Sequence, residues 1–370
     1  MKFSTSKTEL QQALQKLSKA SPTRSTLPIL SCVLVDSKED KTTLRTTDLE
    51  LTIQSEIPSS LEEPGVAALP LKTLLDITNE LPETRLTITV DDKYRTTIET
   101  DLGKYDLVAK PPEEFPETPQ QKTSERLDIP GKTLKEIISA TTFAVSKDEL
   151  KPALTGVLFQ VSPSGITAVS TDGHRLVKYT RKDHSSDSFA GELIIPKKFL
   201  TYMGSHLTEE VVQISVAENF IGAKIGNDKV LTRVISEAFP NYETVIPKEN
   251  NKKLEVEKDL LLGSIRRVAI FSNKATHQVA LSLSQELCSI STEDPEKSSK
   301  AQETISAQYE GDPITIGYNA EYLKDVVSHI SGNTVLVDLN TPVSAALFSS
   351  AATEEHTEST MLLMPIRLND

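Results

Sequence analysis

The chain has 370 residues, of which 37% are hydrophobic and 25% are charged, as in a folded protein with two or three domains of roughly 100–200 residues each. Its formal net charge of −13 disfavours binding to nucleic acid over the whole surface, because phosphate contacts need Lys and Arg. The two cysteines, Cys32 and Cys288, lie far apart without the spacing of metal ligands, which argues against a disulfide scaffold and indicates a reducing compartment.

Membrane-spanning and secretory segments are not expected. No apolar run reaches about 18 residues, and the first residues lack the apolar core of a signal peptide. We therefore expect a cytoplasmic protein.

Three segments, which begin at residues 1, 125 and 251, open in the same way, with a short strand followed by an amphipathic helix. In the first of these helices, the apolar residues at the spacing of one helix face are Leu10, Ala13, Leu14 and Leu17. Ser6 and Glu9 have the spacing of a capping box, which predicts that this helix begins just after Ser6.

Two further landmarks recur in each segment. A threonine precedes an acidic residue at 47–48, 171–172 and 292–293, and a second amphipathic helix follows each pair. The sequence between these landmarks is typical of antiparallel strands, with a hairpin turn at 226–228. We therefore predict an α+β fold of three similar domains, each with two helices on antiparallel sheets. The predicted domains are residues 1–124, 125–250 and 251–370.

The predicted helices differ in charge from the rest of the chain. They hold thirteen basic and seven acidic residues, so the remainder carries a net charge of −19. These helices are residues 7–20, 71–80, 132–144, 197–207, 258–274 and 320–331. A surface built from them can face a polyanion, although ordinary solvated helix faces also favour lysine. Because the chain has no Trp and only 5% aromatic residues, we expect any DNA contact to be with the backbone, without stacking on bases.

One stretch, residues 170–176, brings Asp172 and His174 together in a chain with six histidines. The pair can belong to a catalytic site, to a metal site or to a turn at a binding surface. Catalysis also needs a nucleophile and an oxyanion site, and a metal needs further ligands. Asp48 has the same place in the first segment without a following histidine, which favours a structural role for the aspartate.

Five short motifs occur in order along the chain: TLPIL at 26–30, TDLE at 47–50, STDGHRL at 170–176, FPNYETVIP at 239–247 and MPIRL at 364–368. Through them the whole chain resembles the bacterial DNA polymerase III beta subunits, the sliding clamps. The resemblance implies a head-to-tail homodimer whose six domains close a ring around double-stranded DNA, with the helices lining the hole. It also implies a non-enzymatic processivity factor without a cofactor. The implied partners are the replicative polymerase alpha subunit, a clamp loader, and other replication and repair proteins.

The resemblance further implies a hydrophobic pocket for the Leu- and Phe-rich tails of partner proteins. The residues that map onto this pocket are Leu154, Thr171, Gly173, His174, Arg175, Leu176, Pro240, Val245, Asn319, Tyr322, Leu362, Leu363, Met364, Pro365, Ile366 and Arg367. Aliphatic and Met side chains suit varied apolar groups, and His174 and Arg175 can bond a peptide. Thr244 replaces a basic residue of some members, which predicts weaker polar anchoring. Pro152 and Ala153 replace an aromatic pair that some members use against DNA, so that contact is not expected.

Six basic residues are expected to face DNA, and they are Arg24, Lys132, Lys135, Lys197, Lys198 and Arg266. For the dimer interface, the resemblance implies that Tyr105, on an edge strand, faces Ile270 and Phe271 of the partner, with strands paired edge to edge. If Ile270 and Phe271 instead belong to the core of the chain, they will be buried. The alternatives to a clamp are an acidic repeat scaffold that binds apolar peptides without DNA, and a hydrolase.

Overall fold

We describe a computed structural model of the chain, which covers residues 1–22, 24–38, 41–118, 125–183, 189–352 and 355–368. The chain forms two compact units, residues 1–132 with 198–234, and residues 133–197 with 235–370. The middle repeat contributes to both units, so the units differ from the three predicted domains. The predicted end of the first domain, at residue 124, lies outside the described residues.

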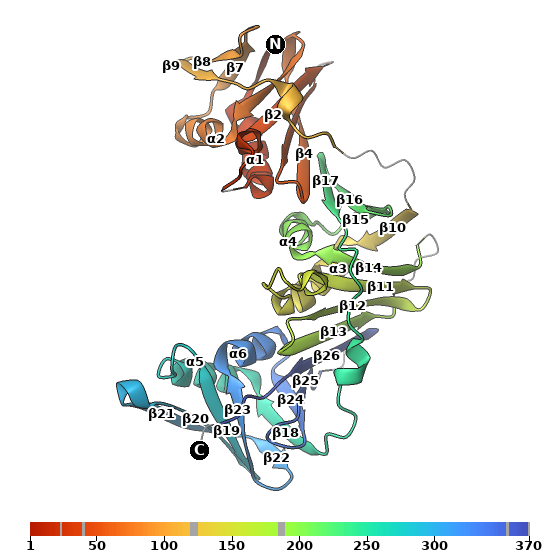
Figure 1. Ribbon diagram of the computed structural model, residues 1–370, viewed down its shortest axis with the longest axis vertical. Coiled ribbons are helices and arrows are strands. Elements are labelled where there is room, and N and C mark those ends of the chain that lie inside the picture. The colour runs from red at the N-terminus through yellow and green to blue at the C-terminus, as the bar shows by residue number, and fades with distance from the viewer. Residues whose placement is uncertain (23, 39–40, 119–124, 184–188, 353–354, 369–370) are drawn as a thin grey trace. The chain divides into compact units, whose positions relative to one another are not determined.

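The first unit contains two antiparallel sheets (Figure 1). The smaller sheet has the strand order β5 (Ser60–Glu63), β1 (Lys2–Ser6), β7 (Arg85–Val90), β8 (Arg95–Thr100) and β9 (Gly103–Val108). The larger sheet has the order β10 (Glu125–Pro130), β15 (Val211–Val216), β16 (Phe220–Ile225), β17 (Asp228–Arg233), β4 (Leu51–Pro58), β3 (Lys41–Thr47), β2 (Cys32–Lys38) and β6 (Gly65–Pro70). Because β17 pairs with β4, with Val230 opposite Ile53, the sheet of the first repeat continues into the second repeat.

The second unit repeats this arrangement with different strands. Its larger sheet has the order β14 (Gly191–Pro196), β11 (Gly156–Ser162), β12 (Gly165–Thr171), β13 (Arg175–Arg181), β26 (Thr357–Leu363), β25 (Ala346–Ser350), β24 (Thr334–Leu339), β18 (Lys252–Glu257) and β22 (Gln308–Glu310). The smaller has the order β21 (Ser299–Ser306), β20 (Leu287–Asp294), β19 (Gln278–Ser284) and β23 (Ile314–Asn319). Here β13 pairs with β26, with Val177 opposite Met361, so the second repeat joins the third.

The α-helices of the described residues begin within one residue of the predicted positions. They are α1 (Lys7–Leu17), α2 (Leu71–Glu80), α3 (Gly131–Thr141), α4 (Lys197–His206), α5 (Lys258–Ala269) and α6 (Ala320–His329). Helices α1 and α2 pack together in the first unit, and α5 and α6 in the second. The predicted cap at Ser6 is confirmed, since its side chain accepts the backbone N–H of Glu9 at 3.2 Å.

Helix α5 is shorter than predicted. The sequence predicts a helix to residue 274, but α5 ends at Ala269. Beyond it the backbone tightens into single turns, in which the N–H of Phe271 bonds the carbonyl of Val268 at 3.0 Å. Ile270 and Phe271 are therefore displayed on a turn and not on a helix face, although their apolar character continues the helical pattern.

The predicted hairpin at 226–228 is present but is one residue shorter. Gly226, with φ of 56°, and Asn227 make the turn, whereas Asp228 is the first residue of β17. Asp228 is only 2% exposed, and its carboxylate accepts bonds from Ser55 Oγ at 2.6 Å and Lys16 Nζ at 2.8 Å. Strand β17 starts early because this aspartate is bound by the neighbouring strand and helix.

The third threonine–acid pair differs from the other two. Residues 292–293 lie inside β20, whereas 47–48 and 171–172 mark the ends of strands. The threonine–acid pattern alone therefore did not identify the turn in the third repeat, where the strand runs on to Asp294.

Both cysteines are free thiols in the core. Cys32 is 1% exposed and Cys288 is fully buried. Burial raises the pKa of the Cys32 thiol and raises that of Cys288 to about 12, because a thiolate is costly in an apolar environment.

We predict that Asp228→Asn lowers the free energy of unfolding by roughly 1–3 kcal/mol, because it leaves Lys16 without its anionic partner. Chemical denaturation of the purified variant measures this loss. The control is Lys229→Gln, at the next and exposed residue, which should stay within about 0.5 kcal/mol of the parent. Equal stability of the two variants would contradict a structural role for the buried aspartate.

Candidate functional site

Residues 171–175 form a tight turn between β12 and β13. Thr171 Oγ1 accepts the N–H of Gly173 at 3.1 Å, and Asp172 Oδ1 accepts the N–H groups of His174 and Arg175 at 2.9 and 3.0 Å. Gly173 has φ of 90°, which a residue without a side chain adopts at no steric cost. The structure therefore places Asp172 as the residue that shapes the turn, as the sequence analysis favoured.

The first repeat has the same turn with different side chains. Asp48 Oδ1 accepts the N–H groups of Glu50 and Leu51 at 3.1 and 2.8 Å. Leu49 occupies the position of Gly173 with φ of 79°, which is strained for a residue with a side chain. The repeated aspartate is thus structural, and the histidine is particular to the second repeat.

The guanidinium of Arg175 connects this turn to α6. Its nitrogens donate to Asp172 Oδ2 at 3.0 Å, Asp325 Oδ2 at 2.6 Å and the carbonyl of Phe143 at 2.8 Å. It also lies 4.7 Å from the centre of the Tyr322 ring. Arg175 is 7% exposed, so this cation is almost removed from water. Its hydrogen bonds are made to other groups of the chain. This favours a role in fixing the turn against α6, and not in direct contact with a peptide.

Aromatic rings complete this side of the site. The exposed imidazole of His174 stacks on Tyr322, with 5.6 Å between ring centres. Phe143 stacks on His329 of α6 at 3.8 Å. Burial, with the nearby charge of Asp172, raises the pKa of the Tyr322 hydroxyl, so it stays a protonated donor at neutral pH.

The C-terminal strand lies directly beside the turn. In the β13–β26 pair, Leu176 is opposite Leu362, and the N–H of Met364 bonds the carbonyl of His174 at 2.8 Å. Beyond Met364 the chain continues along β23, where the N–H of Ile366 bonds the carbonyl of Gly317 at 2.8 Å. Residues almost 200 positions apart in the sequence therefore share one surface.

All sixteen residues predicted for the pocket belong to the second unit. The described contacts join the turn, β13, β26 and Tyr322 into one group. Asn319 instead caps α6, accepting the N–H of Glu321 at 2.9 Å. Val245 and Met364 are 54% and 41% exposed, so they offer apolar surface that a partner could cover. No described contact links Leu154, Val245 or Arg367 to this group.

The geometry does not support catalysis by Asp172 and His174. Both oxygens of the aspartate accept bonds from the turn and Arg175, and the imidazole stacks on Tyr322. Within the described residues, no group of three or more His, Cys, Asp and Glu could hold a metal ion. A group of this kind can bind an extended apolar segment and offer it a few polar contacts.

The basic residues predicted to face DNA fall into two groups. Arg24, Lys132, Lys135 and Arg266 are exposed. Lys197 is half-buried at the start of α4, where burial, followed by the charges of Lys147 and Arg175, lowers the pKa of its ammonium. Lys198 forms an ion pair with Asp48, so part of its charge is neutralised within the chain.

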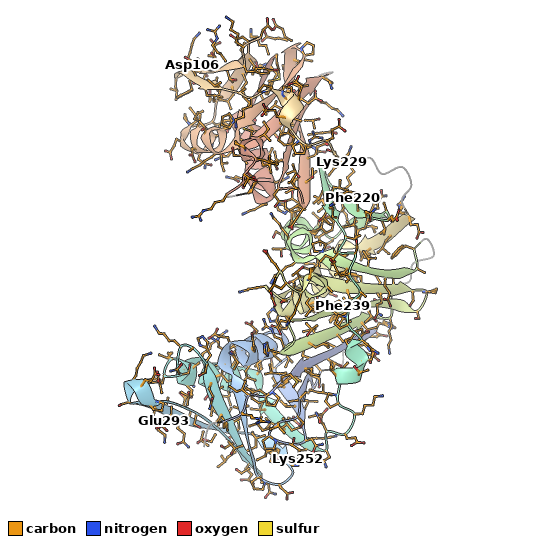
Figure 2. All side chains as sticks on the ribbon, viewed as in Figure 1. Asp106, Phe220, Lys229, Phe239, Lys252 and Glu293 are labelled. Atoms are coloured by element: carbon orange, nitrogen blue, oxygen red, sulfur yellow. The ribbon has the colours of Figure 1, made fainter. Side chains whose placement is uncertain are left out.

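The residues predicted for the dimer interface lie at sheet edges or on exposed turns. Tyr105 is half-buried on β9, at one end of its sheet, and Figure 2 labels its neighbour Asp106. Ile270 and Phe271 are 77% and 45% exposed, so they do not belong to the core of the chain. Strand β21 is also the last strand of its sheet.

Sequence reasoning missed the partners of Arg175. Asp325 is 150 positions away and was counted only among the acidic residues of the predicted helices. Phe143 contributes a backbone carbonyl, for which a sequence carries no signal. The repeat could have suggested that the second helix of one repeat meets the turn of the preceding one, since Lys198 of α4 meets Asp48 in the same way.

Comparison with known proteins identifies the relatives of this chain. Three family models match in order: the N-terminal domain of the DNA polymerase III beta subunit at residues 1–119, its central domain at 128–241 and its C-terminal domain at 243–367. A beta sliding clamp of Pseudomonas putida is 30% identical over the full length of both chains, and one of Chlamydia muridarum is 26% identical, also over both full lengths.

Solved structures agree. The DNA polymerase III subunit beta of Pseudomonas aeruginosa is 28% identical with a TM-score of 0.91, and a sliding clamp of Bartonella birtlesii, bound to griselimycin, is 26% identical with a TM-score of 0.94. Each comparison covers both chains completely. No helix among the described residues is long and apolar enough to cross a membrane.

We predict that Arg175→Ala destabilises the second unit by about 3–5 kcal/mol, because it leaves two carboxylates and a carbonyl without their shared donor. Thermal unfolding measures the loss. Arg175→Lys should recover only part of it, since an ammonium cannot reproduce the fork of the guanidinium. The control is His174→Ala at the adjacent exposed position, with an expected cost below about 1 kcal/mol. Equal melting temperatures of the two alanine variants would show that Arg175 does not hold the turn to α6.

Proposed function

Because the chain belongs to the DNA polymerase III beta subunit family, we propose that it is a DNA sliding clamp, a processivity factor that encircles duplex DNA and tethers the replicative polymerase. Strand pairing supports this most directly. Each larger sheet runs without a break from one repeat into the next, while β9 and β21 are left at the ends of their sheets. A head-to-tail dimer that pairs these edges would close a ring of six domains.

The charge distribution supports loose contact with DNA. The helices that would line the hole carry a net positive charge, whereas the rest of the chain is strongly acidic. Exposed side chains such as Lys135 and Arg266 can attract phosphates through water without reading bases. Retention would then depend on the closed ring, which allows sliding, and not on strong binding. Since Lys198 is partly neutralised by Asp48, we expect it to contribute less than Lys135.

The surface around His174, Tyr322 and Met364 is the proposed docking site for partner tails. His174 and Tyr322 provide an aromatic wall, and Met364 and Val245 provide exposed apolar side chains. An extended Leu- and Phe-rich segment fits such a surface, and the replicative polymerase, the clamp loader and other replication and repair proteins are the proposed partners. In this arrangement Arg175 positions the turn that carries His174.

Other parts of this proposal follow from family membership. The protein is a non-catalytic accessory subunit without a cofactor, and we place it with the nucleoid in the bacterial cytoplasm. We keep the domain limits 1–124, 125–250 and 251–370 as a proposal, close to the ranges that the family models match.

The first test of the clamp is its dependence on DNA topology. The labelled protein is loaded by its clamp loader onto nicked circular DNA, isolated, and then treated with an enzyme that cuts the circle once. We expect retention on the circle and loss on linear DNA, because a ring slides off an open end. Retention on linear DNA would mean ordinary surface binding. Absence from both forms, with an active loader, would favour the acidic peptide-binding scaffold.

The docking site has its own test. We predict that Met364→Ala weakens binding of a Leu- and Phe-rich tail peptide roughly tenfold, because a large apolar contact is lost. Fluorescence anisotropy with a labelled peptide measures the affinity. Val211→Ala, which shortens an apolar side chain of the first unit that is 61% exposed, should leave binding unchanged. The same affinity for both variants would place the docking site elsewhere.

The proposed interface is tested by oligomeric state. We predict that Ile270→Asp combined with Phe271→Asp converts the dimer to a monomer, because charges would be buried against the partner. Light scattering gives the mass. The matched control is Leu150→Asp, at an apolar side chain that is 91% exposed and lies outside the proposed interface. If the double variant remains a dimer, the interface lies at other residues.

A further inference from the structure

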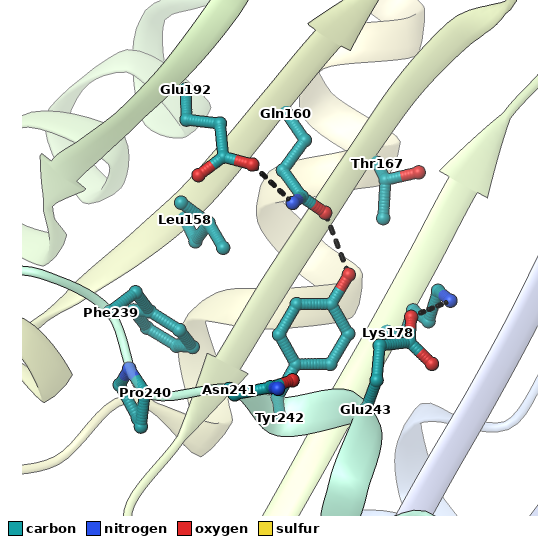
Figure 3. A pocket seen from close by; sticks show the side chains of 10 residues that line it. All are labelled: Leu158, Gln160, Thr167, Lys178, Glu192, Phe239, Pro240, Asn241, Tyr242 and Glu243. Atoms are coloured by element: carbon teal, nitrogen blue, oxygen red, sulfur yellow. Dashed lines mark hydrogen bonds and ion pairs between the residues drawn. The ribbon is translucent and has the colours of Figure 1, made fainter.

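A polar cavity of about 500 Å³ lies in the second unit, between the larger sheet and the segment 239–243 (Figure 3). Strands β11, β12, β13 and β14 supply one side of it, and the crossing segment supplies the other. The chain already places a cation in one half of this cavity. Lys178 Nζ lies 2.5 Å from Glu243 Oε1 and 5.6 Å from the centre of the Tyr242 ring.

Hydrogen bonds fix the middle of the cavity. The hydroxyl of Tyr242 donates to Gln160 Oε1 at 2.7 Å, and Gln160 Nε2 donates to Glu192 Oε1 at 2.7 Å. Burial raises the pKa of Tyr242 to about 12, so the hydroxyl remains a donor at neutral pH. Because a carboxylate only accepts, Glu192 faces Nε2 of Gln160, and Oε1 is left to accept from Tyr242. The carboxylate of Glu192 is thereby held in place.

The other half of the cavity combines three kinds of surface. Glu192, Leu158 and Phe239 lie on the side away from Lys178 (Figure 3). Leu158 is 4% exposed and offers an apolar floor, Phe239 is a half-buried ring, and Glu192 is an exposed carboxylate. A long aliphatic chain with a cationic head matches this combination, because its stem can cover the floor while its head meets the carboxylate and the ring.

We propose that this half of the cavity binds an arginine or lysine side chain of a partner protein, next to the partner's apolar tail. The inference rests on the proposed docking site. Phe239 and Tyr242 pack in one hydrophobic cluster with Leu176 and Leu362 of that site, and Pro240 lines the cavity and belongs to the predicted pocket. A chain that leaves the apolar pocket along the segment 239–243 therefore reaches the cavity.

Charge selects a cation over an anion. The lining carries two carboxylates, Glu192 and Glu243, and one ammonium, Lys178. Since Lys178 is paired with Glu243, the remaining charge is that of Glu192. A cationic side chain would thus neutralise the carboxylate of Glu192, whereas an acidic side chain would be repelled by it.

The test compares two peptides on two proteins. Each peptide has the same Leu- and Phe-rich tail and a Gly-Ser spacer, with a single arginine or its neutral isostere citrulline at matched positions along the spacer. The arginine peptide should bind the parent about three- to tenfold more tightly at one position, with less advantage at high salt. The Glu192→Gln variant should bind the arginine and citrulline peptides with equal affinity. The citrulline peptide should bind the parent and the variant with the same affinity.

Glu237→Gln is the matched control, because Glu237 is an exposed glutamate of the same connecting segment that does not line the cavity. It should keep the full advantage of arginine. Equal binding of the two peptides at every position would overturn the proposal, even if Glu192→Gln did not fold. Equal loss of the advantage on both glutamine variants would mean general attraction to an acidic surface and would overturn it as well. If the citrulline peptide itself does not bind, the docking site fails, and the cavity proposal falls with it.

Discussion

The buried guanidinium of Arg175 is the interaction on which the candidate site depends. A charge taken out of water costs several kcal/mol unless it is paired, and here Asp172, Asp325 and a backbone carbonyl provide the compensation. Because Asp172 also fixes the backbone of the turn, its ion pair with Arg175 determines the positions of His174 and of the Tyr322 ring. The surface proposed for partner tails is therefore already ordered, so a tail that binds there would not bear the entropy of ordering it.

Much of the fold could be predicted from the sequence, because it depends on local patterns. Helix starts followed from apolar periodicity and from a capping residue such as Ser6, and the repeat predicted the alternation of helices and antiparallel strands. The end of α5 could not be predicted, since Ile270 and Phe271 continue the helical pattern although their apolar side chains are exposed. The pairing of Arg175 with Asp325 has no local signal in the sequence, and only the equivalence of the repeats could have pointed to a contact between α6 and the turn.

The two larger sheets join the repeats through their backbones, so charged side chains are not needed for this purpose. Backbone hydrogen bonds such as those between β17 and β4 join consecutive repeats without using side-chain charge. The helices can therefore carry a net positive charge while the rest of the chain is acidic. Where a helix charge does serve the structure, as in the pair of Lys16 with Asp228, part of that charge is neutralised within the chain.

The burial of both cysteines has a practical consequence for site-specific labelling of the protein. With thiol pKa values raised by the apolar core, Cys288 to about 12, almost no reactive thiolate exists at neutral pH. A new cysteine on the surface would thus be the one group that maleimide dyes modify readily. Fluorescent labels, spin probes or engineered cross-links can accordingly be introduced one at a time into the native sequence, without first replacing Cys32 or Cys288 and creating a void in the core.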